Sequence, residues 1–219
     1  MPAVLNHAGV SEDTRNVLEW IKVKYPGSPV TQIGFSLGAN VTLKMAGEDG
    51  SRPSGNLDSV VAVSPPVDLE ASSLRMSEAD NRIFERVFVK YMIHDMNLLM
   101  KMNPDLEKLE LPKELSIRAF EEIFATHRAG FKNAKDYYQK CSSINYIPEI
   151  KIPSLILSSI DDPVVDSRAL TKVPHADNLD IILTEHGGHV GFLGWGTRYD
   201  EVRWSDQAVA RWLEDTMAI

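Results

Sequence analysis

The residues with the clearest chemical potential form a short motif around Ser36. The run Gly34-Phe35-Ser36-Leu37-Gly38 places a serine between two glycines, after a strand-like apolar segment and before a helical one. This is the pattern of a nucleophile elbow, in which a sharp, strained turn projects the serine hydroxyl above a sheet edge. The two glycines would let neighbouring backbone approach closely. We predict Ser36 as a nucleophile and the backbone N–H of Leu37 as an oxyanion donor, with a plain tight turn as the alternative.

A serine hydroxyl is a weak nucleophile near neutral pH, so it needs a base, and the base needs an orienting acid. In sheets with such an elbow the acid follows a late strand. Asp161-Asp162-Pro163 comes directly after an apolar run. We favour Asp162, which lies one residue further from the strand and precedes the stiff Pro163, and we expect Asp161 to cap the turn. Asp68, after an earlier strand, is the alternative acid, and its structural role would be capping.

The candidate base lies in a glycine-rich loop after the last predicted strand, where the sequence reads His186-Gly187-Gly188-His189. We predict that His189, the last residue of the glycine turn, reaches Ser36, and that His186 is a loop or packing residue. Because this pair lacks a third ligand, we predict no metal site here. We expect the remaining histidines to be surface or packing residues: His7, His94, His127 and His175.

The elements that must position these residues alternate between strand and helix in two blocks. Apolar runs predict strands at 30–35, 59–64, 154–158 and 179–184, and helical periodicity predicts helices from 11, 37 and 205. Between the blocks, residues 72–147 carry apolar stripes at helical spacing, and we predict no strand there. The pattern predicts a single α/β domain over residues 1–219, with a mostly parallel sheet and a helical cap insertion at about 72–147.

Three methionines in the insertion, Met92, Met96 and Met100, are spaced four residues apart. Methionine is adaptable, so these side chains could line a site for an acyl chain. The alternative is ordinary packing between helices, and the sequence alone leaves both interpretations open.

Composition bounds the class of protein. The chain has 219 residues, of which 43% are hydrophobic and 25% charged, as expected for a globular domain. The net charge of −8 argues against nucleic acid as a partner. Cys141 is the only cysteine, which excludes an intrachain disulfide and favours a reducing compartment. With neither an apolar run of about 18 residues nor a signal-peptide pattern, we expect a cytoplasmic protein without a transmembrane segment.

Taken together, the motifs resemble the YheT-like branch of the α/β-hydrolase superfamily, whose eukaryotic relatives include membrane-attached acylglycerol lipases. The resemblance covers nearly the whole chain, and Ala39 stands where the family often has glycine. It also includes His7-Ala8-Gly9, Gly130-Phe131-Lys132 and Asp136-Tyr137-Tyr138. It implies an α/β-hydrolase fold, a small-molecule ester or lipid substrate, and hydrolysis without a cofactor. It also implies Ser36 as nucleophile, Asp162 as acid and His189 as base.

The front of the chain departs from the family pattern. The family's elbow follows the fifth strand of an eight-stranded sheet, whereas only 35 residues precede Ser36 here. We therefore expect the first four strands to be missing, together with the loop that normally supplies a second oxyanion N–H. The strand at 30–35 would then be an exposed edge, open to self-association. The alternatives to a carboxylesterase or lipase are an impaired fragment or pseudoenzyme, and an acyltransferase with the same triad.

Overall fold

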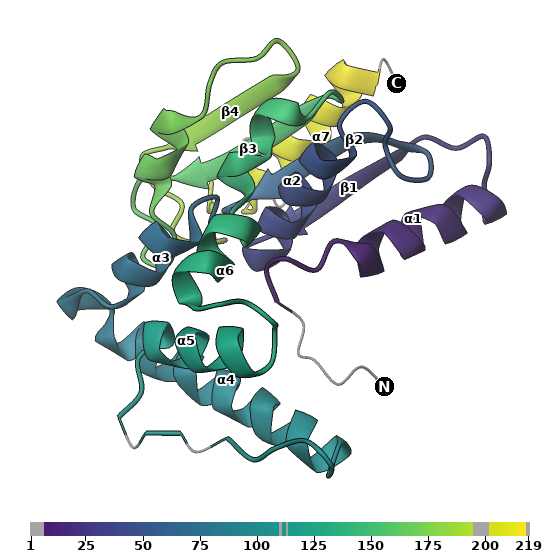
Figure 1. Cartoon of the computed structure of the whole chain (residues 1–219). Coiled ribbons are helices and arrows are strands. Elements are labelled where there is room, and N and C mark those ends of the chain that lie inside the picture. Colours follow the sequence, from purple (N-terminus) through teal and green to yellow (C-terminus); the bar gives the residue numbers. More distant parts are fainter. Residues whose placement is uncertain (1–6, 110, 113, 195–201, 218–219) are drawn as a thin grey trace.

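The computed structural model describes residues 7–109, 111–112, 114–194 and 202–217. Four parallel strands form one sheet in the order β1-β2-β3-β4 (Figure 1). The strands are β1 (Val30–Phe35), β2 (Leu57–Val63), β3 (Ser154–Ser159) and β4 (Leu179–Thr184). The predicted α/β class and the predicted strands are confirmed, with strand ends that shift by no more than two residues.

The two central strands are buried on both faces, as continuous apolar runs predict for a parallel sheet. On one face, Val60 and Ile156 pack with Leu43 of α2 (Leu37–Asp49). On the other face, Val61 and Leu155 pack with residues of α7 (Trp204–Met217). The sheet is therefore the middle layer between α2 and α7, and α1 (Glu12–Lys24) lies beside β1 (Figure 1).

The chain between β2 and β3 is helical wherever the structure describes regular structure. It forms α3 (Leu69–Met76), α4 (Arg82–Met102), α5 (Ile117–His127) and α6 (Ala134–Cys141), with short 3-10 turns at Ala79–Asn81, Ser143–Asn145 and Ile147–Glu149. Helices α4 and α5 lie away from the sheet (Figure 1) and share a small core. One further 3-10 segment, Ser167–Lys172, connects β3 to β4. None of the helices in the described ranges combines the length and apolar character needed to cross a bilayer.

Candidate active site

Ser36 occupies the turn between β1 and α2, at the carboxyl edge of the sheet. Its backbone has φ 51° and ψ −123°, a conformation that costs energy for any residue with a Cβ. Hydrogen bonds hold the turn: the Ser36 N–H donates to the Val63 carbonyl at 2.9 Å, and the Ser36 carbonyl accepts from Ala39 and Asn40. The strained turn that the elbow pattern predicts is therefore present.

The two glycines of the elbow have different surroundings. A Cβ on Gly34 would lie 2.5 Å from Thr42 Oγ1 and 2.6 Å from the Gly38 carbonyl oxygen. A Cβ on Gly38 would have no neighbour within 4 Å outside its own stretch of helix. The predicted close approach of backbone is therefore right for Gly34 and wrong for Gly38, because Gly38 faces the open side of the turn.

His189 joins Ser36 to Asp162 in an unbroken chain of hydrogen bonds. Its Nε2 lies 2.7 Å from Ser36 Oγ, and its Nδ1 lies 2.9 Å from Asp162 Oδ2. Asp162 is buried, and its Oδ1 accepts hydrogen bonds from the backbone N–H groups of Val164 and Val165 at 2.8 and 2.9 Å. An ionised carboxylate can only accept, so Nδ1 donates to Asp162 and Nε2 is left to accept the Ser36 proton.

The alternative residues take structural positions. Asp161 Oδ1 accepts from the Gly187 and Gly188 N–H groups at 2.9 and 2.8 Å, so it caps the turn of the histidine loop rather than its own turn. His186 is exposed, with Nδ1 3.4 Å from Asp161 Oδ2. Asp68 caps the start of α3 by accepting from the Ala71 N–H at 3.0 Å. In the part of the chain that the structure describes, none of these three side chains forms a hydrogen bond with Ser36 or His189.

Two serines that belong to none of the sequence motifs support the histidine loop. Ser64, with φ 49°, donates its hydroxyl to the carbonyl of His189. Ser159 donates to the carbonyl of Gly188 at 2.6 Å. Both serines lie at carboxyl ends of parallel strands, where side chains at open α/β sheets meet ligands, and that position was the available sequence signal.

The N–H of Leu37 is free to act as a donor. Leu37 is the first residue of α2, so its N–H has no partner within the helix, and no other described group accepts from it. The positive end of the α2 dipole adds to the field at this point. A developing negative charge beside Ser36 would therefore be stabilised here.

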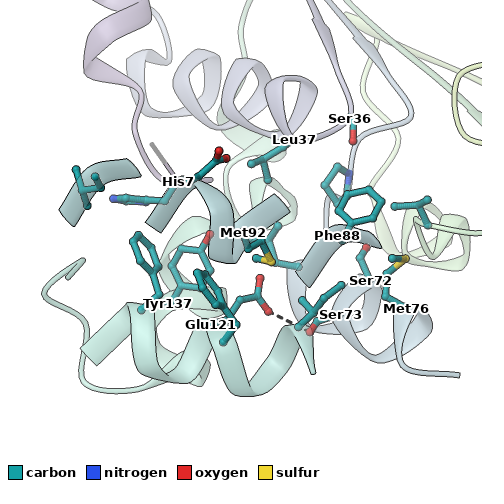
Figure 2. Close-up of a pocket in the computed structure, with 18 of the residues that line it drawn as sticks. His7, Ser36, Leu37, Ser72, Ser73, Met76, Phe88, Met92, Glu121 and Tyr137 are labelled. Atoms are coloured by element: carbon teal, nitrogen blue, oxygen red, sulfur yellow. Dashed lines mark hydrogen bonds between the residues drawn. The ribbon is translucent and has the colours of Figure 1, made fainter. Parts of the chain in front are cut away.

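A cavity of about 570 Å³ opens beside Ser36 and Leu37, between the elbow and the cap helices (Figure 2). Its walls are largely apolar and include Met76, Phe88, Met92, Leu99, Phe120 and Phe124. Met92 lines the cavity, whereas Met96 is fully buried in the small core of the cap. The packing interpretation holds for Met92, Met96 and Met100, which all pack in or against the core of the cap, and Met92 lines the cavity as well.

His7 also lines this cavity. Its ring packs edge-on against Phe124, Phe131 and Tyr137, which confirms the packing interpretation and adds a place in the cavity wall. Burial, and secondarily the charge of Lys44, lowers the pKa of His7. Within the described residues, no three His, Cys, Asp or Glu side chains gather in a way that could hold a metal ion.

The sequence pattern of the family described as "alpha/beta hydrolase fold" matches residues 5–194, which include the elbow, the acid turn and the histidine loop. The chain belongs to the α/β-hydrolase fold family. The fold and the family resemblance predicted from the motifs are thus confirmed.

Curated relatives of this α/β-hydrolase include YheT of Escherichia coli (strain K12), 30% identical over 211 residues that cover 94% of this chain and 61% of YheT. A monoacylglycerol lipase of Saccharomyces cerevisiae is 26% identical over 220 residues, which cover 96% of this chain and 48% of the lipase. The chain therefore spans between about half and three-fifths of the length of these relatives. Among solved structures, Pyrococcus furiosus esterase Pf2001 superposes with a TM-score of 0.54 at 19% identity, covering 97% of this chain and 65% of that one. This last likeness supports the fold alone.

Proposed function

We propose that this α/β-hydrolase is a serine hydrolase that cleaves carboxylic esters of acyl chains, either simple acyl esters or acylglycerols. The observation that carries the proposal is the hydrogen-bond chain from Ser36 through His189 to Asp162, which opens onto an apolar cavity. The apolar walls suit an acyl chain, and the yeast relative is named as a monoacylglycerol lipase. The match to the hydrolase family supports the same reaction class.

In this mechanism the first half-reaction forms an acyl-enzyme. Ser36 Oγ attacks the ester carbonyl carbon while His189 Nε2 takes the serine proton. Asp162 keeps the imidazole in the required tautomer and stabilises the imidazolium ion. The Leu37 N–H donates to the oxyanion of the tetrahedral intermediate. His189 then gives the proton to the leaving alkoxide, so that the alcohol departs and the acyl group stays on Ser36.

The second half-reaction releases the acid. A water molecule gives a proton to His189 Nε2 and attacks the acyl carbonyl, and the returning proton frees the Ser36 hydroxyl. An alcohol in place of water would yield a new ester from the same intermediate. Hydrolysis in the presence and absence of added ethanol, with both products measured, separates a hydrolase from an acyltransferase.

Active-site labelling tests the proposal directly. A fluorophosphonate probe should label the wild-type protein and should leave Ser36→Ala unlabelled, while Ser51→Ala, at an exposed position, keeps full labelling. A p-nitrophenyl acyl ester should be hydrolysed by the wild type and by Ser51→Ala but not by Ser36→Ala. Labelling that survives in Ser36→Ala would contradict the assignment of the nucleophile. Labelling of the wild type without any ester turnover would instead favour the impaired-fragment or pseudoenzyme alternative.

A further inference from the structure

The wall of the cavity across from Ser36 carries a carboxyl group that the proposed reaction does not use. Glu121 of α5 lines the cavity together with Ser72 and Ser73 of α3, and Figure 2 shows these three on the far side from Ser36. Most of the other residues that line the cavity are apolar, and a buried polar group among apolar side chains costs free energy unless it is hydrogen-bonded.

The polar groups of this wall are only partly satisfied by the protein. Glu121 Oε2 accepts hydrogen bonds from Tyr138 Oη at 2.6 Å and from Ser73 Oγ at 3.1 Å. Glu121 Oε1 has no hydrogen-bond partner in the described part of the chain. Ser72 is 8% exposed, and its Oγ is buried without a partner among the described residues. A polar oxygen without a protein partner in such a wall gains from pairing with a water molecule or with a ligand group that takes the place of that water.

The kind of ligand group follows from the protonation of Glu121. Burial raises the pKa of Glu121 to about 7, against the hydrogen bonds from Tyr138 and Ser73 and the charge of Arg118. The carboxyl is therefore present in both forms near neutral pH. Because Oε2 already accepts two hydrogen bonds, the proton of the neutral form belongs on Oε1, from which it would point to a ligand acceptor. The charged form would accept from a ligand donor at the same oxygen.

A hydroxyl is the simple polar group that pairs with both forms, because it can donate and accept. A carbonyl pairs with the neutral form only, and an ammonium pairs well with the charged form only. Ser72 Oγ can serve as a second partner, since a hydroxyl also donates and accepts.

We propose that Glu121 and Ser72 form a subsite that binds a hydroxyl group of the substrate, on the wall of the cavity across from Ser36. The inference rests on the proposed ester hydrolysis and deepens it by naming a substrate class, hydroxyl-bearing acyl esters. Two sources present this chemistry: the alcohol part, as in a monoacylglycerol, and a hydroxylated acyl chain. Both would leave the apolar part of the substrate against the Met92 and Phe120 walls.

The test compares three esters of one chain length: ethyl decanoate, monodecanoylglycerol, and the ethyl ester of ω-hydroxydecanoic acid. The hydroxyl preference is kcat/KM for a hydroxylated ester divided by kcat/KM for ethyl decanoate. We expect a wild-type preference of about tenfold for at least one hydroxylated ester, the size of effect that one or two buried hydrogen bonds provide. Whichever ester shows it identifies the source of the hydroxyl.

Matched variants assign the preference to this wall. Glu121→Met, which keeps the volume and removes the oxygens, should bring the preference close to one, and Ser72→Ala should lower it about threefold. Glu122→Met is the control, because Glu122 is exposed on the next position of α5 and accepts from the Ala134 N–H instead. A preference that survives in both Glu121→Met and Ser72→Ala, or its absence from the wild type, overturns the proposal. If Glu121→Met does not fold, the hydroxyl preference of Ser72→Ala decides: a preference equal to that of the wild type overturns the proposal.

Binding of ethers separates this inference from the proposed reaction, because ethers cannot be hydrolysed. Displacement of a fluorescent fatty acid would compare decyl ethyl ether with decyl glyceryl ether and with the ω-hydroxylated decyl ether. Tighter binding of a hydroxylated ether by the wild type, lost in Glu121→Met, supports the subsite even where no ester is cleaved. Ester hydrolysis with equal binding of all three ethers would uphold the reaction and refute the subsite.

Discussion

The two sides of Ser36 differ in how many protein groups surround them. The relay flank consists of Asp162 and the loop that carries His189, and the opposite flank consists of Leu37 and the end of β1. On the relay flank, both oxygens of Asp162 are hydrogen-bonded, and Asp161, Ser64 and Ser159 all bind the backbone of the loop that carries His189. On the opposite flank, called the open flank below, Leu37 and Phe35, the last residue of β1, are exposed. Phe35 is 54% exposed there, and β1 pairs with β2 as its sole strand neighbour in the described chain.

The difference shows which parts of such a site the described strands and loops supply by themselves. Asp162 and His189 lie in the loops that follow the neighbouring parallel strands β3 and β4, and Ser64 at the end of β2 supports the His189 loop, so the carboxyl ends of three adjacent strands supply the relay flank. The open flank concerns the stabilisation of the oxyanion and the cover of the β1 edge, which depend on whatever packs against β1. We therefore expect the geometry for proton transfer to be well held in this chain. Substitutions on the open flank should instead change the stability of the elbow and the self-association of the protein.

The largest effect should come from cutting the relay. Asp162→Asn replaces the acceptor of the His189 Nδ1 proton with an amide, which disturbs the tautomer that leaves Nε2 free. We expect kcat for a p-nitrophenyl ester to fall on the order of 10⁴-fold with little change in KM. Asp161→Asn is the matched control, since it keeps one carbonyl oxygen for the Gly187 and Gly188 N–H groups. Equal losses in the two variants would show that the loop, and not the relay, sets the rate.

The second prediction compares the packed and open sides of the elbow. Gly34→Ala forces a Cβ against Thr42 and the Gly38 carbonyl, so the free energy of unfolding should fall by about 1–3 kcal/mol. Gly38→Ala meets open space within a helix, and it should leave stability unchanged or raise it by up to about 1 kcal/mol. Urea denaturation of both variants provides the measurement. Destabilisation by Gly38→Ala equal to that of Gly34→Ala would mean that the open side is in fact covered.

The third prediction concerns the cavity and its pH dependence. The pKa of Glu121 is raised from 4.5 to about 7 by burial, so between these values the folded protein keeps a proton that the unfolded chain has lost. Stability is then lost as pH rises through this window, and the whole penalty is present above the folded pKa. Glu121→Gln has no proton to release. Its free energy of unfolding, relative to that of the wild type, should therefore rise by on the order of 2 kcal/mol between pH 5 and pH 8.

Urea midpoints at the two pH values measure that gain, and Glu122→Gln is the control because Glu122 is exposed. The expected sign is specific, since a carboxyl whose pKa is lowered by folding would make the wild type more stable at the higher pH. A Glu121→Gln difference that does not grow with pH would contradict a buried, mainly neutral carboxyl.

Much of the framework was predictable because it depends on local patterns. Unbroken apolar runs such as Val60–Val63 identify buried parallel strands, and the glycine-flanked Ser36 identifies the strained turn. The carboxyl end of β2 marks Ser64 as a residue near the site, but its bonding partner was not predictable, because His189 lies 125 residues away. The place of Glu121 was not predictable either, because Ser73, which donates to it, lies 48 residues away. The expectation for Gly38 failed for a related reason, since a sequence pattern does not show which side of a turn other elements cover.

The smallest effect should appear at the β1 edge. The β1 sequence, Val30–Phe35, has no charged residue, and Ile33 and Phe35 are exposed, whereas the other edge strand, β4, carries Asp180 bonded to Trp212 Nε1 at 2.7 Å. Charged residues protect sheet edges against pairing with other chains, so β1 is the edge at which we expect copies to associate.

Ile33→Lys should therefore raise the protein concentration at which self-association begins by about tenfold, an effect of about 1.4 kcal/mol, measured by sedimentation velocity. Ile181→Lys on β4 is the matched control, because Ile181 is 39% exposed and Ile33 is 43% exposed. A charge at equal exposure should matter more on the unprotected strand. Equal shifts in the two variants would indicate general apolar association, and the open flank would then differ from the relay flank in exposure without offering a specific pairing edge.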